Sequence, residues 1–263
     1  RLLTPTGMSY VEFYKYHGAG NDFILIDNRS NTLTLTTETI AQWCHRNYGV
    51  GADGLMLLEA PKVEGDDFYM QYFNADGRES SMCGNGGRCI ARFAVDIGIA
   101  TEGTLYFHAI DGPHVAVVSE FSVALSMIDA PAVISRNNGF FIDTGSPHHV
   151  ENRTPGSDFV RTARLIRDVY GSEGANVNFI QACEGELSIR TYERGVENET
   201  LACGTGATAA AMVAVAQGWV PSAPVRLYAQ GGILTVDFKG TGPFTDVVLT
   251  GPAAQVFKGW LPL

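Results

Sequence analysis

The sequence lacks any apolar run long enough to cross a membrane. Its longest, residues 207–216, is interrupted only by Thr208 and reaches about half of the ~20 residues that a membrane-spanning helix needs. The N-terminus carries a single Arg and no long apolar stretch, so it does not resemble a secretory signal. We therefore expect a cytoplasmic protein with no membrane partner. Residues 1–7, which precede Met8, are interpreted as a leader or as vector-derived residues.

Paired cysteines are also missing. The five cysteines are an odd number and no two are spaced as Cys-x-x-Cys, which argues against a disulfide framework and against a zinc site. We expect no bound metal. Cys44, Cys89 and Cys183 lie in helix-like or strand-like patterns, where a cysteine is usually a small packing residue. Cys83 and Cys203 remain as candidates for chemistry.

Positive charge is scarce. The chain has 18 Lys and Arg against 28 Asp and Glu, a net charge of −10. Binding to nucleic acid requires clustered Lys and Arg, so we expect no nucleic-acid partner. One or two buried cations could still bind a small zwitterionic substrate. With 263 residues, the chain is long enough for two domains with ordinary apolar cores.

Short strand-like runs dominate the sequence, and four helices interrupt them. The helices are expected at residues 37–48, 84–97, 159–170 and 205–217. The strands are expected at residues 13–16, 24–27, 55–59, 68–73, 104–107, 115–118, 122–127, 140–143, 176–181, 186–192, 225–229, 232–238 and 245–249. Each half therefore repeats one plan, and we place the boundary between Ser119 and Pro131.

Near-copies of one motif open the second helix of each half. Cys83-Gly84-Asn85-Gly86-Gly87-Arg88 and Cys203-Gly204-Thr205-Gly206-Ala207-Thr208 place their cysteines 120 positions apart. A helix N-terminus offers unpaired backbone N–H groups and about half a positive charge, which stabilise a thiolate. The same N–H groups can bind a substrate carboxylate, and the glycines let it approach the backbone closely. Each motif thus predicts a base beside an anion site.

Two opposed thiols suit inversion of an amino-acid α-carbon. One thiolate removes the α-proton on one face, and one thiol returns a proton on the other. General acid–base catalysis contributes only ~10² to 10⁴ in rate, which is too little for so weak a carbon acid. Backbone donors are the second contribution, since loss of one such donor typically costs ~2.7 to 4 kcal/mol.

Several ordered motifs resemble the diaminopimelate epimerase family, a group of cofactor-independent amino-acid epimerases, from Phe13 to the C-terminus. The motifs that carry the resemblance are Lys15-Tyr16-His17-Gly18-Ala19-Gly20-Asn21-Asp22-Phe23, Phe73-Asn74-Ala75-Asp76-Gly77, Cys83-Gly84-Asn85-Gly86-Gly87-Arg88-Cys89, Gly145-Ser146-Pro147-His148, Asn176-Val177-Asn178-Phe179, Tyr192-Glu193-Arg194-Gly195 and Ala202-Cys203-Gly204-Thr205-Gly206. Singly, the Asn-rich and Pro-His segments are typical of turns. Their joint occurrence with both cysteine motifs favours a functional interpretation.

The resemblance implies an α+β fold of two pseudo-symmetric domains, each a mostly antiparallel, barrel-like sheet around a central helix. It implies an N-terminal epimerase domain over residues 8–125 with Cys83 and a C-terminal one over residues 126–250 with Cys203. Residues 251–263 would return to the first domain. The implied activity is interconversion of LL- and meso-diaminopimelate in lysine and peptidoglycan biosynthesis, with no cofactor. A homodimer is expected from the resemblance alone.

The resemblance also assigns roles at the site, which it places in the cleft between the domains. Cys83 and Cys203 would be the two acid/base residues. The reacting carboxylate would be bound by amides of Gly84, Asn85, Gly204 and Thr205. Glu193 and His148 would contact the reacting amino group or aid thiol deprotonation. The distal end of the substrate would be bound by Asn21, Asn74, Asn176 and Arg194, with the Arg194 fork on the distal carboxylate.

Two positions depart from the family pattern. Many members have Asn at the position of Ser146, and some have Gln at that of Gly54, both directed at the distal end. Because these differences concern specificity, a two-cysteine racemase of the histidine or proline type is an alternative.

Two alternatives come from other classes of protein. Gly204-x-Gly206-x-x-Ala209 formally fits a dinucleotide fingerprint, although the preceding residues 193–199 are too polar for a buried strand. A non-catalytic amino-acid-binding or redox protein could instead join Cys83 and Cys203 in a disulfide. Activity under reducing conditions separates the redox alternative from an enzyme.

Overall fold

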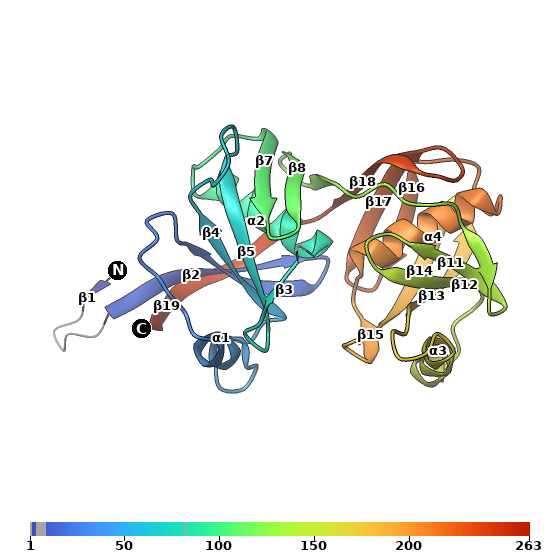
Figure 1. The fold of residues 1–263 in the computed structure, drawn as a ribbon, viewed down its shortest axis with the longest axis horizontal. Coiled ribbons are helices and arrows are strands. Elements are labelled where there is room, and N and C mark those ends of the chain that lie inside the picture. The colour runs from blue at the N-terminus through green and yellow to red at the C-terminus, as the bar shows by residue number, and fades with distance from the viewer. Residues whose placement is uncertain (1, 4–8, 82) are drawn as a thin grey trace. The chain divides into compact units, whose positions relative to one another are not determined.

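The structure is a computed structural model that describes residues 2–3, 9–81 and 83–263 (Figure 1). Of residues 1–7, only Leu2–Leu3 are described, as strand β1 antiparallel to the start of β2. The interpretation of the other five as a leader lies outside the described residues.

Within these residues the chain forms helices and many short strands, which confirms the prediction of an α+β fold. The helices are α1 (Thr37–Cys44), α2 (Gly84–Asp96), α3 (Phe159–Asp168) and α4 (Gly204–Ala216). The strands are β1 (Leu2–Leu3), β2 (Ser9–Gly18), β3 (Asn21–Asp27), β4 (Gly54–Glu59), β5 (Phe68–Asn74), β6 (Glu79–Ser80), β7 (Gly103–Ala109), β8 (Gly112–Val118), β9 (Val123–Ser126), β10 (Ile134–Arg136), β11 (Gly139–Asp143), β12 (Pro147–Asn152), β13 (Asn176–Cys183), β14 (Glu186–Glu193), β15 (Asn198–Thr200), β16 (Val225–Ala229), β17 (Gly232–Lys239), β18 (Thr245–Gly251) and β19 (Ala254–Pro262).

The chain divides into two compact units. Unit 1 comprises Arg1–Leu125 and Ala253–Leu263, and unit 2 comprises Ser126–Pro252. Unit 1 is therefore built from two separate stretches of sequence, whereas unit 2 is continuous.

Unit 1 contains a sheet in the order β19, β2, β3, β4 and β5. Neighbouring strands are antiparallel, except that β3 and β4 are parallel. Residues 23–26 of β3 and 54–58 of β4 are buried without alternation. Such continuous apolar runs are typical of strands that are covered on both faces.

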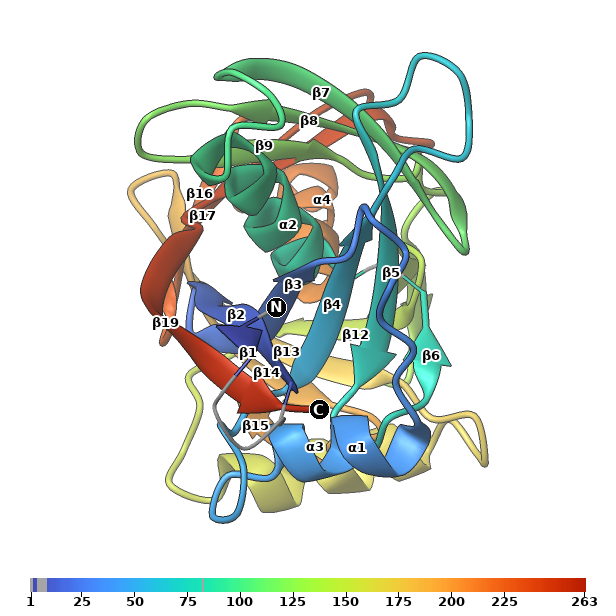
Figure 2. The same cartoon turned by 90° about the vertical axis from the view of Figure 1, so that its left-hand side faces the viewer.

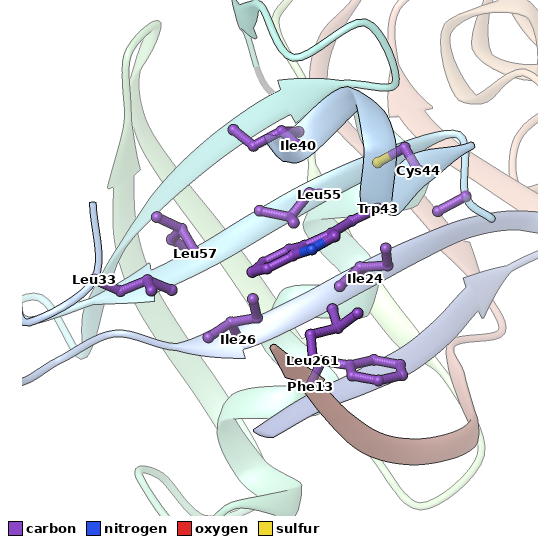
Figure 3. Packing of buried hydrophobic residues seen from close by; sticks show 11 residues of the cluster. Phe13, Ile24, Ile26, Leu33, Ile40, Trp43, Cys44, Leu55, Leu57 and Leu261 are labelled. Carbon is purple, nitrogen blue, oxygen red and sulfur yellow. The ribbon is translucent and has the colours of Figure 1, made fainter. Parts of the chain in front are cut away.

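Helices cover the two faces of this sheet (Figure 2). On one face, Trp43 of α1 packs with Ile24 and Leu55 in an apolar cluster that also includes Leu261 of β19 (Figure 3). On the other face lies α2, where the rings of Phe93 and Tyr16 have centroids 5.7 Å apart. Fully burying one large apolar side chain contributes about 1.5–3 kcal/mol, so both helices are held mainly by this packing.

Unit 2 repeats this plan with its own strands. Its strands β11, β12, β13 and β14 form consecutive pairs, of which β12 and β13 are parallel and the others antiparallel. Strands β16, β17 and β18 continue from β14. Helix α4 is apolar around its circumference, and its residues 206–214 are buried, as expected for a helix enclosed by a sheet. Helix α3 packs Phe159 and Ala163 against Phe179 and Tyr192.

Three details differ from the sequence-based expectations. The helix expected at residues 37–48 ends at Cys44, because the His45 ring accepts the N–H groups of Asn47 (3.1 Å) and Tyr48 (3.2 Å) in a turn. The helix expected at residues 159–170 ends at Asp168. Cys183, expected to be buried or neutral, is exposed at the end of β13.

In the part of the chain that the structure describes, no helix has the length and apolarity to cross a bilayer.

Candidate active site

Cys83 is the N-cap residue of α2 in unit 1. Its backbone is extended (φ −101°, ψ 136°), and its carbonyl oxygen accepts the N–H of Gly87 at 2.7 Å. The first N–H groups of an α-helix have no partner within the helix, so Cys83 occupies a position where a helix can stabilise an anion. The sequence-based prediction that Cys83 opens a helix is confirmed.

A directed chain of hydrogen bonds surrounds Cys83. Arg88 Nη2 donates to Asn85 Oδ1 at 2.8 Å, and Asn85 Nδ2 donates to Asn21 Oδ1 at 3.2 Å. Asn21 Nδ2 donates to the carboxylate of Asp53 at 2.5 Å. The Cys83 thiol donates to the same Asn21 Oδ1, with Sγ 3.7 Å away. Three predicted site residues, Cys83, Asn85 and Asn21, are thus brought together.

Sequence reasoning gave no role to Arg88. It is fully buried, and its Nη1 donates to the carbonyl oxygen of Gly84 at 3.2 Å. Burial lowers the pKa of this guanidinium, and the nearby thiols Cys89 and Cys83 act in the opposite direction. Its place in the motif after Cys83 was the available signal, because a cation about one turn into a largely buried helix is unusual.

Cys203 is the N-cap residue of α4 in unit 2. Its backbone is extended (φ −120°, ψ 117°), and its carbonyl oxygen accepts the N–H of Ala207 at 2.9 Å. Its sulfur accepts the backbone N–H of Gly206 at 3.4 Å and lies 3.5 Å from Thr205 Oγ1. Here too the predicted helix start is confirmed.

His148 lies behind Thr205, on strand β12. Its side chain is fully buried, and its Nε2 is 2.9 Å from Thr205 Oγ1. Burial, with a smaller effect of the positive charge of Arg194, lowers the pKa of His148 to about 3. The imidazole is therefore neutral at physiological pH and is joined to Cys203 through the Thr205 hydroxyl.

Asn178 is a second residue that sequence reasoning left without a role. Its Nδ2 donates to His148 Nδ1 at 3.1 Å and to the carbonyl oxygen of His149 at 3.1 Å. Its Oδ1 accepts the hydroxyl of Thr191 at 2.9 Å. The parallel pairing of β12 with β13 brings Asn178 and His148 together across 30 residues of sequence. The second Asn of Asn176-Val177-Asn178-Phe179 was the only signal.

Asn176 and Arg194 are also linked within unit 2. Asn176 Oδ1 accepts the backbone N–H of Arg194 at 3.0 Å, and its Nδ2 donates to Ser146 Oγ at 2.8 Å. The Arg194 guanidinium donates to the carbonyl oxygen of Glu173 at 2.8 Å.

Glu193 and Asn74 lie at the ends of strands. Glu193, the last residue of β14, accepts the hydroxyl of Thr200 at 2.5 Å. Asn74 is exposed at the end of β5, opposite Gly54. In the described part of the chain its side chain makes no hydrogen bond, so it is not joined to the group around Cys83.

The two departures from the family pattern have different structural settings. A Cβ on Gly54 would lie 2.6 Å from the Tyr72 ring and 2.6 Å from the carbonyl oxygen of Phe73, so the Tyr72 ring occupies the space of a side chain. Ser146 instead contacts a candidate site residue, because its hydroxyl accepts from Asn176.

The dinucleotide-binding alternative is excluded by the local fold. Gly204 and Gly206 already belong to the first turn of α4, and the preceding strand β15 is antiparallel to β14. A dinucleotide fingerprint requires a buried strand, a glycine loop and a helix within a parallel unit. No group of three or more His, Cys, Asp or Glu side chains among the described residues is arranged to bind a metal.

Comparison with known proteins identifies the family. A family model described as diaminopimelate epimerase matches residues 13–131 and 140–256. The chain belongs to the diaminopimelate epimerase family. The matched ranges include both hydrogen-bonded groups described above, so the resemblance noted in the sequence is confirmed.

Relatives in this family match nearly the full chain. The diaminopimelate epimerase of Flavobacterium psychrophilum is 44% identical over 256 residues, which cover 94% of this chain and 99% of the relative. That of Chlorobaculum tepidum is 44% identical over 266 residues, with coverage of 94% and 99%.

Several solved structures share the fold of this chain. A hydroxyproline epimerase from Agrobacterium vitis superposes with a TM-score of 0.69 at 15% identity, covering 97% of this chain and 92% of that one. A phenazine biosynthesis protein of the PhzF family from Bacillus anthracis gives a TM-score of 0.69 at 15% identity, with coverage of 97% and 100%. At these identities the likeness concerns the fold alone.

Proposed function

We propose that this chain is a diaminopimelate epimerase, an isomerase of lysine and peptidoglycan biosynthesis that uses Cys83 and Cys203 and no cofactor. The reaction is supported by relatives of that name that are 44% identical over 94% of the chain. The two-thiol mechanism rests on one observation, that both cysteines are N-caps of the glycine-rich helices α2 and α4.

Inversion requires two groups that reach one α-carbon from opposite faces. A thiolate takes the α-proton, and the electron pair of the broken C–H bond moves onto the α-carbon and its carboxylate. The other cysteine then gives its S–H proton to the opposite face, which forms the new C–H bond and leaves that sulfur as the thiolate. N–H groups at a helix start stabilise both the thiolate and the charge that develops on the carboxylate.

The remaining roles belong to the same proposal. The backbone amides of Gly84, Asn85, Gly204 and Thr205 bind the reacting carboxylate. Glu193 and His148 serve the reacting amino group or the thiol, and for His148 the link to Cys203 through Thr205 supports the second of these. The distal end of diaminopimelate is bound by Asn21, Asn74, Asn176 and Arg194.

Deuterium exchange tests the reaction and its substrate. The protein is incubated with LL-diaminopimelate in D₂O with a thiol reductant and without pyridoxal phosphate or metal. We expect deuterium at one α-carbon and formation of the meso isomer. Absence of both would overturn the substrate assignment. If a panel including histidine and proline also failed to exchange, the racemase class itself would be wrong.

A cytoplasmic location and a homodimer are further parts of the proposal, and they rest on family membership alone. Sedimentation equilibrium over a range of protein concentrations tests the second: a single species with the mass of one chain would contradict the dimer.

A further inference from the structure

We propose that in the substrate-free protein Cys203 is the thiolate and Cys83 is the thiol, and that Asn178 is a positioning residue that sets this assignment through His148 and Thr205. The inference deepens the proposed two-thiol function, which requires one cysteine in each protonation state. It rests on the directions of the hydrogen bonds around the two sulfurs.

The hydrogen bonds around Cys83 favour a protonated sulfur. The amide of Asn21 is oriented by the carboxylate of Asp53, which can only accept, so Asn21 Nδ2 is directed at Asp53 (2.5 Å). The guanidinium of Arg88 can only donate, which orients the Asn85 amide in the same sense. Asn21 Oδ1 therefore faces Cys83 Sγ at 3.7 Å. A thiol can donate to this oxygen, whereas a thiolate would be repelled by the lone pairs of the oxygen.

The hydrogen bonds around Cys203 run in the opposite direction, so that donors rather than acceptors face its sulfur. Asn178 Nδ2 is directed at the carbonyl oxygen of His149 (3.1 Å), which can only accept, so a donor also faces His148 Nδ1 at 3.1 Å. Nδ1 is then the acceptor nitrogen of a neutral imidazole, and Nε2 carries the hydrogen. Nε2–H donates to Thr205 Oγ1 at 2.9 Å. The Thr205 hydroxyl is left to donate to Cys203 Sγ at 3.5 Å.

One contact would favour the other tautomer of His148, but it is weaker than the contacts that favour Nε2–H. Asn176 Nδ2 lies 3.4 Å from His148 Nε2, where it would favour an acceptor nitrogen. Both hydrogens of that amide nitrogen already have closer acceptors, Ser146 Oγ at 2.8 Å and the carbonyl oxygen of Pro147 at 3.2 Å. Nε2 therefore keeps its hydrogen for Thr205. With the N–H of Gly206 at 3.4 Å, the sulfur of Cys203 faces two donors.

Charged groups near Cys83 have opposing effects on the formation of a thiolate. The buried cation of Arg88 favours a thiolate, but two of its N–H groups are directed at oxygens of Gly84 and Asn85. The carboxylate of Asp53 opposes a thiolate, and it is paired with Arg46 at 2.7 Å. The direct contact of the sulfur with an amide oxygen favours the thiol form of Cys83.

Near Cys203, His148 is neutral and contributes no charge. Of the charged groups on the neighbouring strand and turn, the guanidinium of Arg194 donates to the carbonyl oxygen of Glu173 and, besides burial, lowers the pKa of His148, and the carboxylate of Glu193 accepts from Thr200. Both cysteines are N-cap residues, so the effect of the helix N-terminus is common to them, and the two donors that face the Cys203 sulfur are added to it.

This assignment determines which isomer the substrate-free protein can convert first. The isomer whose α-hydrogen faces Cys203 loses its proton to that sulfur, and the proton of Cys83 forms the new C–H bond. The turnover leaves Cys203 as a thiol and Cys83 as a thiolate. The resting state returns when a proton moves from Cys203 to Cys83, or when a molecule of the other isomer reacts in the opposite sense.

The first test measures the protonation of each cysteine without turnover. Iodoacetamide reacts with thiolates, and its rate at each residue is followed against pH by peptide mass spectrometry. Trypsin cleavage at Arg78 and Arg88 separates the Cys83 peptide from Cys89. We expect the midpoint for Cys203 to lie at least about one pH unit below that for Cys83. Equal midpoints, or a lower one for Cys83, would overturn the proposal.

The second test uses variants of the hydrogen-bond chain. Thr205→Val removes the hydroxyl and should slow alkylation of Cys203 at neutral pH by roughly 10- to 100-fold, because a hydrogen bond to a charged group is lost. Thr205→Ser should restore the rate. Asn178→Leu should raise the Cys203 midpoint while Thr205 is intact. An unchanged midpoint in the folded Thr205→Val variant would show that the hydroxyl does not donate to the sulfur.

Nitrogen NMR reads the tautomer directly. In ¹⁵N-histidine-labelled protein, with His148 assigned by its loss in His148→Asn, we expect a neutral Nε2–H imidazole from pH 5 to pH 9. An Nδ1–H tautomer would overturn the role of Asn178. These measurements need no substrate, so they test the assignment of the thiolate independently of the proposed function. A failure of deuterium exchange would overturn the proposed function without deciding which cysteine is the thiolate.

Discussion

Asn178 Oδ1 lies so close to Gly206 that a Cβ atom at that position would approach it to 2.6 Å. The same Cβ would lie 3.3 Å from Cys203 Sγ. The glycine of the second cysteine motif is therefore required by the side chain that orients His148. In the first motif, a Cβ on Gly86 would meet the flexible ends of two methionines, Met56 at 3.2 Å and Met70 at 3.7 Å. The two motifs look alike in sequence but differ in what lies next to them.

Gly206→Ala should accordingly be more harmful than Gly86→Ala. Overpacking typically costs about 1–3 kcal/mol, and about 1 kcal/mol shifts the melting temperature of a chain of this size by roughly 2–4 °C. We expect Gly206→Ala to lower both the melting temperature and kcat, since Asn178 or Cys203 must move. Gly86→Ala is the matched control. Comparable losses in both variants would show that the contact with Asn178 is unimportant.

Removal of either thiol of the proposed pair should abolish epimerisation. Cys83→Ala and Cys203→Ala each leave one face of the α-carbon without an acid or base, so turnover should stop in both directions while circular dichroism stays native. Cys183→Ala, at an exposed thiol outside the site, should keep full activity. A folded Cys83→Ala or Cys203→Ala protein that keeps more than a few per cent of activity would contradict the two-base mechanism.

The buried imidazole of His148 should make the protein sensitive to acid. Its pKa is lowered to about 3 in the folded state, mainly by burial, against ~6.5 for an unfolded histidine. Between these pH values only the unfolded chain binds the proton, so the stability present above ~6.5 is lost as the pH falls. From pH 7 to pH 5, urea unfolding should show a loss about 2 kcal/mol greater than in His148→Gln.

The control is the same comparison from pH 8 to pH 9, where His148 binds no proton in either the folded or the unfolded chain. Wild type and His148→Gln should then change in stability by the same amount. An equal loss of stability from pH 7 to pH 5 in His148→Gln and wild type would mean that His148 is charged in the folded protein.

A side chain at position 54 should conflict with Tyr72. Gly54→Ala should cost about 1–3 kcal/mol of unfolding free energy, because its Cβ would lie 2.6 Å from the Tyr72 ring. In a Tyr72→Ala background the cost should fall by at least ~0.5 kcal/mol, with the remainder due to the carbonyl oxygen of Phe73. Additive effects of the two substitutions in urea unfolding would exclude this coupling.

Local sequence signals predicted the motif helices well. The expected helix at residues 84–97 corresponds to α2, Gly84–Asp96, and that at 205–217 to α4, Gly204–Ala216. Both end just before glycines at positive φ, Gly98 and Gly218, which are common at this position because no Cβ opposes the left-handed conformation. The early end of α1 depends instead on the His45 ring, which no helix periodicity reveals.

The sequence could not predict whether a hydrogen-bond donor or an acceptor faces each sulfur. This depends on which atom of each amide faces the sulfur, and that is decided by residues far apart in the chain. Asp53 orients Asn21 across 32 positions, and β12 must pair in parallel with β13 before Asn178 can reach His148. Turn propensity describes an Asn by its local backbone, so it gives no information about such contacts.

Because β19 pairs with β2, unit 1 cannot be completed until β19 has been synthesised. Strand β19, Ala254–Pro262, pairs antiparallel with β2 at the other end of the chain, and Leu261 joins the cluster around Trp43. During translation, unit 2 is complete once Pro252 has left the ribosome, whereas unit 1 still lacks an edge strand although most of it was made first. We therefore expect the edge of β2 to stay open to mispairing until the last strand of unit 1 emerges.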